Sequence, residues 1–592
     1  MIQNPPEGNH PRAWSRFFNP IYLFLGAVLL MLYFAGLGYP PLYEPDEGRY
    51  MEIPREMILN HDYVTPHLDG VDYFEKPPLY YWLNVISIKL FGINEFAARF
   101  WSALLGLLGL GLAAVLAHTM RSGRSAFLTI IILGSCPLYL FMAHLATIDM
   151  VLTFTSTACL LCFWLARCEP EKRRGRARLW WYGMFVAAAL SVLTKGLIGM
   201  VFPAGIIGIY IVWSGEWRLL RRVPWLTGTL FFLVVAAPWH ILMAVRHPDF
   251  LHFYFVREHF LRYLTPIENR TQPFWFFIPV IVLGFLPWTG YLAGAGRLLS
   301  RSKVRSWGRE HPEIVFLFSW IGFIFLFFSA SDSKLIPYML PAFPALAVLA
   351  ALTIDSGLHA ANPFPLSQRV GATVGALLCV VLAAVLGWAA MGRIPEFSVR
   401  GAFFPLVLGF SIVSVVLLLL SAILSLLPHF KGRTIAFFLA SACLFGTIWT
   451  AARPVGMERS AKPFVPYLQA HLKPGDGLYS FNYYPQTLPV YLRREINVAA
   501  FRGELNFGIK RLPRELRQER FPSGRAFAKR WRKSPRIYLV TDHESLPLLR
   551  SLGVSPIYTI KEKRTVILLT NHPPSPGASG DANSTKSARS GS

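Results

Sequence analysis

The chain has 592 residues, of which 54% are hydrophobic and only 15% are charged, whereas soluble proteins carry roughly 25% charged residues. Its formal net charge is +25, and much of the excess lies in short segments between long apolar runs, as at 167–178 and 297–309. The positive-inside rule gives this distribution to cytoplasmic loops, so composition excludes a soluble fold and argues against a nucleic-acid partner.

The first apolar run covers residues 21–37, behind Arg12 and Arg16. No small-residue cleavage site follows it, so we expect an uncleaved first span with the N-terminus in the cytoplasm. Soon after comes a charged stretch, Glu-Pro-Asp-Glu-Gly-Arg-Tyr at 44–50, and then Phe-Glu-Lys-Pro-Pro at 74–78. Ionisable groups beside a membrane span are costly and indicate function.

Residues 79–91 form an apolar run that is too short to cross a bilayer, so we expect an interfacial helix there. Runs of about 18 residues or more can cross a hydrocarbon core about 30 Å thick. The expected spans are 21–37, 96–118, 126–143, 147–166, 179–194, 197–213, 225–244, 274–296, 313–330, 335–353, 369–391, 403–427 and 434–452. These are about thirteen transmembrane helices, and the odd count places the C-terminal region outside, in the periplasm.

Two long outer segments result, 38–95 and 245–273. Shorter outer turns hold Asp149, Lys195 and Lys334. Nearly every charge at a membrane edge outside the basic loops therefore lies on one side of the membrane. This asymmetry predicts an outward-facing active site within a membrane domain of residues 1–452.

In the C-terminal region, segments with a strand pattern alternate with segments with a helical pattern. β-branched and aromatic residues predict strands at 477–483, 497–500, 536–541 and 565–569, and amphipathic patterns predict helices at 462–472 and 544–552. A small periplasmic α/β domain over 453–571 fits these elements, and the Ser/Gly/Pro-rich tail 572–592 should be disordered. No P-loop or glycine-rich dinucleotide motif occurs, so no nucleotide cofactor is expected.

The motifs together resemble a known family. They are Pro-Asp-Glu-Gly-Arg-Tyr at 45–50, Glu-Lys-Pro-Pro-Leu at 75–79, Ala-Thr-Ile-Asp at 146–149, Lys-Gly at 195–196 and Pro-Tyr-Met-Leu-Pro at 337–341. In this order they resemble the lipid-linked-sugar glycosyltransferases, relatives of the protein O-mannosyltransferases with a glycosyltransferase-C fold. Within that superfamily the chain is most similar to bacterial aminoarabinose transferases that modify lipid A. Pro54 departs from the pattern, and we expect the helix around it to kink or begin there.

The resemblance implies an integral inner-membrane enzyme that moves a sugar, 4-amino-4-deoxy-L-arabinose, from undecaprenyl phosphate to a lipid A phosphate on the periplasmic side. Two alternatives stay open. One is transfer of a different polyprenyl-phosphate-linked sugar to a glycan, lipid or protein hydroxyl. The other is a flippase or transporter of a polyprenyl-linked sugar, a class that often shows paired internal repeats, and no repeat is seen here.

Breaking a sugar–phosphate bond requires cations for the leaving phosphate and a carboxylate for the developing positive charge on the sugar. The carboxylate candidates are Asp46, as the principal catalytic residue, and Asp149. The phosphate-binding candidates are Lys76, Lys195, Arg49 and Tyr338. Helix capping by the two aspartates, snorkelling by the lysines and an ion pair of Arg49 with its own helix are the structural alternatives.

The resemblance also implies that Glu75 and His259 hold a divalent metal, plausibly zinc, with Glu258 as a further ligand. Carboxylate and imidazole are common zinc ligands. Two ligands make a weak site on spacing alone, and an ordinary loop histidine is the alternative.

Overall fold

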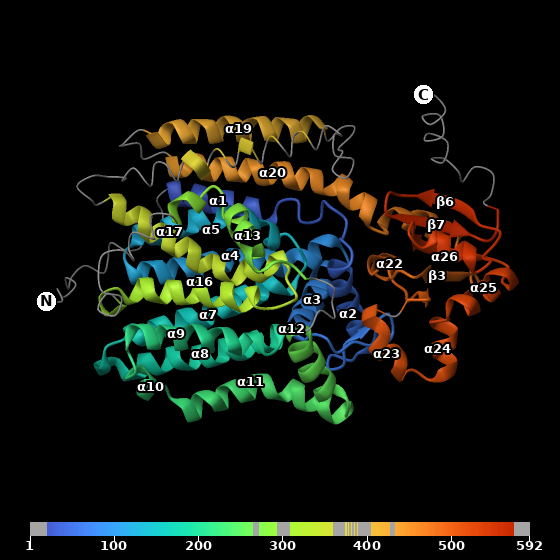
Figure 1. Cartoon of the computed structure of the whole chain (residues 1–592), viewed down its shortest axis with the longest axis horizontal. Helices are drawn as coiled ribbons and strands as arrows, with labels where there is room; N and C mark the ends of the chain where they lie inside the picture. The colour runs from blue at the N-terminus through green and yellow to red at the C-terminus, as the bar shows by residue number, and fades with distance from the viewer. Residues whose placement is uncertain are drawn as a thin grey trace.

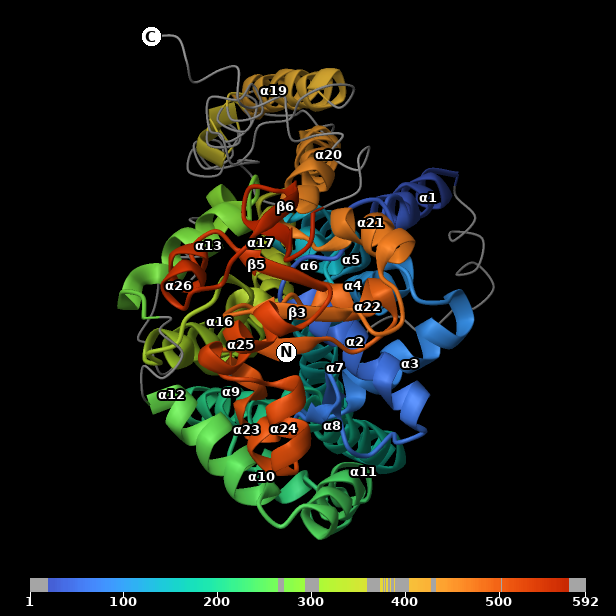
Figure 2. The same cartoon turned by 90° about the vertical axis from the view of Figure 1, so that its right-hand side faces the viewer.

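The computed structural model describes residues 20–264, 271–292, 308–358, eight positions between 373 and 388, 404–426, 433–501 and 503–573. Long helices lie side by side in one bundle, and the C-terminal sheet with its helices sits at one end of it (Figure 1). Seen from that end, the C-terminal elements lie in front of the bundle (Figure 2). The architecture is a mostly helical membrane domain with a small α/β domain at one end.

The first half of the bundle is α1 (Pro20–Phe34), α2 (Asp46–Asn60), α3 (Leu79–Phe91), α4 (Glu95–Met120), α5 (Gly123–Ser135), α6 (Pro137–Ala143), α7 (Ile148–Cys168), α8 (Arg174–Lys195), α9 (Ile198–Ser214), α10 (Leu219–Arg222) and α11 (Trp225–Arg246). The second half is the π-helical η3 (His252–Leu261), α12 (Arg262–Leu264), η4 (Phe274–Phe276), α13 (Phe277–Gly284), α16 (Pro312–Ser329), η5 (Ile336–Ala342), α17 (Phe343–Leu358), α19 (Phe404–Leu426) and α20 (Arg433–Arg459). A two-stranded hairpin, β1 (His67–Leu68) and β2 (Val71–Asp72), lies between α2 and α3.

Among the described residues, seven helices are long and apolar enough to cross a membrane, or eight if α5 and α6 count as one span. The expected interfacial helix is present as the 13-residue α3. The expected span 369–391 lies mostly outside the described residues, and the expected span 274–296 corresponds within them to the short α13. The multi-pass helical fold is confirmed, whereas the count of about thirteen spans stays a prediction.

One expected span is broken. The stretch 126–143 was expected to be a single helix, but α5 and α6 meet at an angle of 68°. The break falls at Cys136, whose ψ of 124° is extended, directly before Pro137. A proline clashes with a helical conformation of the residue before it, so the chain turns here.

The helix does not begin at Pro54, because α2 begins at Asp46 and continues as helix across Pro54 to Asn60. A proline inside a helix removes one backbone donor, which leaves the carbonyl four residues earlier without its usual partner. That carbonyl belongs to Tyr50, and it accepts a hydrogen bond of 3.0 Å from the side-chain amide of Asn84 on α3. The neighbouring helix therefore supplies the donor that Pro54 lacks.

The C-terminal domain contains a five-stranded sheet in the order β4-β3-β5-β7-β6. Its strands are β3 (Gly477–Phe481), β4 (Asn497–Ala499), β5 (Ile537–Asp542), β6 (Tyr558–Glu562) and β7 (Val566–Thr570). The strand β3 pairs in parallel with β4 and β5, and β7 runs antiparallel to β5 and β6. Four of the strands were predicted and β6 was not.

Short helices surround this sheet: α21 (Val465–His471), α22 (Thr487–Leu492), α23 (Asn506–Arg511), α24 (Arg514–Arg520), α25 (Gly524–Lys533) and α26 (Leu546–Ser551). The side chains of Phe527 and Trp531 on α25 pack with Phe481 and Leu539 in a buried apolar core. The helices α22 and α23 lie on the side of the domain that faces α2 (Figure 1). Residues on this side of the domain contact Arg49 of α2, which lines the cavity described below.

Candidate active site

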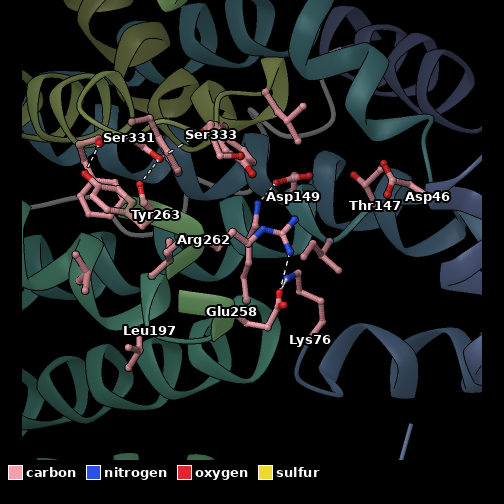
Figure 3. A pocket seen from close by; sticks show the side chains of 18 of the residues that line it. Asp46, Lys76, Thr147, Asp149, Leu197, Glu258, Arg262, Tyr263, Ser331 and Ser333 are labelled. Carbon is pink, nitrogen blue, oxygen red and sulfur yellow. Dashed lines mark hydrogen bonds and ion pairs between the residues drawn. The ribbon is translucent and has the colours of Figure 1, made fainter. Parts of the chain in front are cut away.

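A cavity of about 690 Å³ is lined by residues of α2, α7, α8 and α12. The helices α2 and α12 lie toward the end of the bundle nearest the C-terminal domain (Figure 1). Figure 3 shows side chains from several helices pointing into it. The polar residues that line it are Asp46, Arg49, Tyr50, Lys76, Thr147, Asp149, Lys195, Glu258, Arg262, Tyr263, Ser331, Ser333 and Tyr338. Six of the eight predicted site residues are among them.

Asp46 occupies the first position of α2, where the positive end of the helix dipole favours a carboxylate. Its side chain is 55% exposed, and one oxygen lies 3.3 Å from the guanidinium of Arg49 one turn later. Arg49 is largely buried and also pairs with Glu504 of the C-terminal domain at 3.1 Å. Both residues line the cavity, and Asp46 is the more exposed of the two.

The neighbouring carboxylate, Glu47, points the other way and is buried. It binds the guanidinium of Arg99 on α4 through both oxygens, at 2.8 and 2.6 Å, and accepts the backbone N–H groups of Tyr43 and Ala146. A buried carboxylate with a bidentate arginine is fully satisfied. Glu47 thus anchors the start of α2 to α4 and to the segment before α7.

A second group joins the loop before α3 to η3 and α12. Lys76 lies 3.7 Å from Glu258, and Arg262 binds Glu258 at 2.8 Å and approaches Glu75 at 3.5 Å. Figure 3 shows Lys76, Glu258 and Arg262 turned toward one another. Glu75 also accepts a hydrogen bond of 3.0 Å from the hydroxyl of Tyr73. Two cations and two carboxylates thus meet at one wall of the cavity.

Burial and the neighbouring guanidinium of Arg262 lower the pKa of Lys76 to about 8, against the opposing effect of Glu258 and Glu75. Burial alone would raise the pKa of Glu75, but Lys76, Arg262 and Arg49 hold it below its usual range. Burial and the charge of Glu75 raise the pKa of Glu258. The lysine is therefore protonated at neutral pH and is sensitive to a mildly alkaline medium.

A third group lies across the cavity. Lys195, at the end of α8, donates to Asp149 in the first turn of α7 at 2.5 Å. The same ammonium lies 4.7 Å from the centroid of the Tyr338 ring, a cation–π geometry, and that ring stacks on Phe328. The structure thus brings together Asp149, Lys195 and Tyr338, which are far apart in the sequence.

Of the two predicted metal ligands, Glu75 and His259, the structure describes the side chain of Glu75 only. Glu75 engages Tyr73 and Arg262 as described above, and His259 lies in η3 with its side chain outside the described residues. Within the part of the chain that the structure describes, no three His, Cys, Asp or Glu residues are grouped as metal ligands are. Glu75 offers carboxylate oxygens that suit a divalent ion, but its present partners are a hydroxyl and a guanidinium.

Sequence reasoning missed two kinds of residue. Gln486 and Glu504 come from the C-terminal domain and contact Arg49 at the cavity wall. Thr147 and Ser333 line the cavity, and their buried hydroxyls have no hydrogen-bond partner in the described part of the chain. The only sequence signal for Gln486 was a polar residue within Tyr-Tyr-Pro-Gln-Thr at 483–487, directly after a predicted strand.

Family models match two parts of the chain. The model of the dolichyl-phosphate-mannose-protein mannosyltransferases matches residues 18–254, and that of the aminoarabinose transferase C-terminal domain matches residues 464–571. The first match includes α2, α3 and α7, and the second contains the whole five-stranded sheet. The two matches therefore cover parts of both the membrane domain and the C-terminal domain.

Curated relatives agree. The undecaprenyl phosphate-alpha-4-amino-4-deoxy-L-arabinose arabinosyl transferase of Aeromonas salmonicida is 35% identical over 378 residues, which cover 63% of this chain and 66% of the relative. The enzyme of the same name from Enterobacter sp. (strain 638) is 30% identical over 386 residues, covering 64% of this chain and 67% of the relative. The matched part spans about two thirds of these relatives' length.

Solved structures cover more of the chain. The crystal structure of ArnT from Cupriavidus metallidurans bound to undecaprenyl phosphate superposes with a TM-score of 0.81 at 27% identity, over 94% of this chain and 98% of that one. Its apo form superposes with a TM-score of 0.79 over 93% and 98%. With these matches at both ends, the chain belongs to the undecaprenyl phosphate-4-amino-4-deoxy-L-arabinose arabinosyl transferase family of multi-pass membrane glycosyltransferases with the glycosyltransferase-C fold.

Proposed function

We propose that this chain transfers 4-amino-4-deoxy-L-arabinose from undecaprenyl phosphate to a phosphate of lipid A, on the periplasmic side of the bacterial inner membrane. The observation that carries the proposal is the cavity, which combines the exposed carboxylate of Asp46 with the cations of Lys76, Arg262 and Lys195. This combination suits a sugar whose leaving group is a phosphate. The names of the relatives supply the sugar and the lipid carrier.

The reaction needs no external oxidant or cofactor. A non-bridging oxygen of the acceptor phosphate forms a bond to the anomeric carbon, and the bond from that carbon to the donor phosphate oxygen breaks. The leaving undecaprenyl phosphate keeps the electron pair, and Lys76 and Arg262 are placed to stabilise its added negative charge. Because a phosphate oxyanion is already a nucleophile, the acceptor requires no general base.

Under this mechanism Asp46 stabilises the positive charge that develops at the anomeric carbon, or orients the sugar through its hydroxyl groups. Asp149 is the second carboxylate and holds Lys195 beside Tyr338. The carrier lipid would stay in the bilayer, because each CH₂ group buried in an apolar phase contributes about 0.8 kcal/mol. A cavity at the end of a helical bundle lets such a lipid react without leaving the membrane.

The metal belongs to the same proposal. Glu75 and His259 would hold a divalent ion, zinc, through one carboxylate oxygen and one imidazole nitrogen. Such an ion would fix the loop that carries Lys76 against η3, since Lys76 directly follows Glu75. The protein groups that act on the sugar would be the same with or without it.

The test is transfer by the purified chain in a single detergent or bilayer phase, with undecaprenyl-phosphate-linked aminoarabinose and lipid A. Mass spectrometry should detect lipid A with the added sugar. A flippase would move the donor between leaflets but leave lipid A unmodified, and a hydroxyl-directed transferase would modify a different acceptor. Unmodified lipid A after full consumption of the donor would contradict the acceptor.

A further inference from the structure

The loop before α2 is joined to the C-terminal domain by a half-buried carboxylate. Glu44 accepts the backbone N–H of Gln486 at 2.8 Å and that of Thr487 at 3.0 Å. The hydroxyl of Thr487 donates to the same carboxylate. One side chain of the membrane domain thus takes three hydrogen bonds from two consecutive residues of the other domain.

Gly48 makes this contact possible. A Cβ atom at Gly48 would lie 2.6 Å from the carbonyl carbon of Gln486 and 2.7 Å from the backbone nitrogen of Thr487. Atoms that close overlap, so any side chain here would push the two backbones apart. The first turn of α2 therefore packs directly on the backbone of residues 486 and 487.

The same segment reaches Asp46 through Arg49. The Nε group of Arg49 lies 3.3 Å from the amide oxygen of Gln486 and 3.1 Å from a carboxylate oxygen of Glu504. The amide nitrogen of Gln486 in turn donates to Glu504. The other end of the guanidinium pairs with Asp46 at 3.3 Å. A continuous set of polar contacts thus runs from the C-terminal domain to the edge of the cavity.

We propose that Glu44, Gln486 and Thr487 are positioning residues, through which the C-terminal domain holds the first turn of α2 so that Asp46 and Arg49 face the cavity. We call Glu44, Gly48, Gln486 and Thr487 the clamp. Its effect on catalysis rests on the proposed transfer, whereas its effect on α2 does not.

Docking of the domain alone does not require the clamp. Arg511 on α23 binds Asp72 on β2 at 2.7 Å and Asp249 at 3.1 Å, and Arg520 approaches Asp69 at 3.4 Å. These ion pairs join the same two domains away from the start of α2. They supply a matched control, because removing one of them weakens the interface without touching the clamp.

The clamp also carries a pH signature. Burial raises the pKa of Glu44 to about 7, against the hydrogen bonds from Thr487 and Gln486, and the facing charge of Glu504 adds to the rise. The hydroxyl of Tyr483 faces Glu44 as well, and burial raises its pKa. An undocked Glu44 would titrate near its usual value, so the docked state binds a proton more tightly and docking strengthens as pH falls through about 7.

The experiment compares Glu44→Gln, Thr487→Val and the double variant with Arg511→Gln in the full-length protein. Hydrogen exchange of the backbone amides from Arg49 onward, the first hydrogen-bonded amides of α2, should speed up about tenfold in each clamp variant, because each variant loses a hydrogen bond between Glu44 and residues 486–487. In the wild type the protection factor, which is the intrinsic exchange rate divided by the measured rate at the same pH, should fall as pH rises from about 6 to 8. In Glu44→Gln the protection factor should stay constant over this range, because the titrating group is gone. Arg511→Gln should exchange like the wild type there.

Transfer kinetics give the second readout. The clamp variants should lose about tenfold in kcat and should still bind undecaprenyl phosphate, because Lys76 and Arg262 lie on other elements. Thr487→Ser, which keeps the hydroxyl, should restore kcat. The double variant should lose little more than either single one, since both remove the same contact.

Wild-type exchange in both clamp variants would overturn the proposal, as would equal effects of Arg511→Gln. If the wild type itself transfers no sugar, the proposed function fails, and the exchange arm still decides whether the clamp holds α2. Faster exchange with unchanged kcat would show that the first turn of α2 needs no positioning, which also overturns the proposal.

Discussion

At the scale of single residues, Asp46 and Glu47 show how two adjacent carboxylates take different tasks. Glu47 is buried against Arg99 and satisfied by four hydrogen bonds, whereas the side chain of Asp46 is 55% exposed in a cavity. Sequence reasoning preferred Asp46 for chemistry, and that role stays a prediction. The sequence alone could not show why the two differ, because the partner that occupies Glu47 lies 52 residues away.

Asp46→Asn should abolish transfer and leave the fold intact. The substitution keeps the size of the side chain and removes the charge that stabilises the sugar in the transition state, for which we expect a loss of at least about 100-fold in kcat. Turnover in the reconstituted system is the measurement, with binding of undecaprenyl phosphate as the test of folding. Near-normal turnover would remove Asp46 from the mechanism.

Lys76→Ala should weaken the binding of the donor and of undecaprenyl phosphate by roughly 10- to 100-fold, because a buried charge contact with phosphate is stronger than one at a wet surface. Lys89→Ala is the control, since that lysine lies in the last turn of α3 and donates a hydrogen bond of 3.3 Å to the hydroxyl of Tyr63 at an exposed position. Equal affinities for the two variants would mean that Lys76 contributes no phosphate contact.

His259→Ala should release a bound divalent ion and reduce transfer less than Asp46→Asn does, because the ion would fix a loop and would not contact the anomeric carbon. Metal analysis of the purified wild type and variant gives the answer. Glu258→Gln serves as a comparison variant, because it removes the further carboxylate ligand and leaves the imidazole of His259 in place. A wild type that contains no metal and works fully in chelator would leave His259 as an ordinary histidine.

At the scale of elements, apolar length predicts well because the bilayer imposes one thickness on every span. The bounds expected for the interfacial helix are those of α3, and α7 begins one residue after the expected start. Apolar length alone does not predict how a proline affects a helix, as Pro137 and Pro54 show. At Pro137 the chain turns by 68°, whereas at Pro54 the helix continues because Asn84 satisfies the carbonyl of Tyr50. That difference depends on a neighbour that no local pattern contains.

Asn84→Leu should destabilise the protein by about 1–3 kcal/mol, because it leaves the carbonyl of Tyr50 buried without a donor. Pro54→Ala restores the backbone N–H within α2, so the loss caused by Asn84→Leu should shrink in that background. Denaturation midpoints of the four proteins in this cycle measure the coupling. Additive effects would mean that the hydrogen bond from Asn84 does not compensate for the proline.

At the scale of the whole molecule, the fold class and the α/β nature of the C-terminal domain followed from composition and pattern. The part of the cavity wall formed by Gln486 and Glu504 did not. Polar residues beside a membrane span stand out because they are costly there, but the same residues in a polar domain carry no such signal. Only the packing of one domain on the other brings them to Arg49.

The orientation of the whole molecule can be tested with cysteines. Exposed positions in the C-terminal domain, Asn482→Cys and Lys529→Cys, should react with a membrane-impermeant thiol reagent in cells with a permeable outer membrane. Cys168 is exposed and ends α7, beside a basic segment that the charge pattern places in the cytoplasm, so it should react only after lysis. Labelling is read in the wild type and in a Cys168→Ser background that carries each new cysteine. The reverse pattern would place the cavity on the cytoplasmic side.

The group of four charges that contains Lys76 has a consequence for the whole catalytic cycle. Lys76 and Arg262 have carboxylate partners, Glu258 and Glu75. A phosphate that binds these cations competes with the carboxylates for them. The affinity of this wall for the lipid phosphate is therefore set by the difference between its contacts with the phosphate and its contacts with the two carboxylates. Because the carboxylates offset part of the attraction, undecaprenyl phosphate is held less tightly than by the two cations alone. It can then return to the bilayer after each transfer.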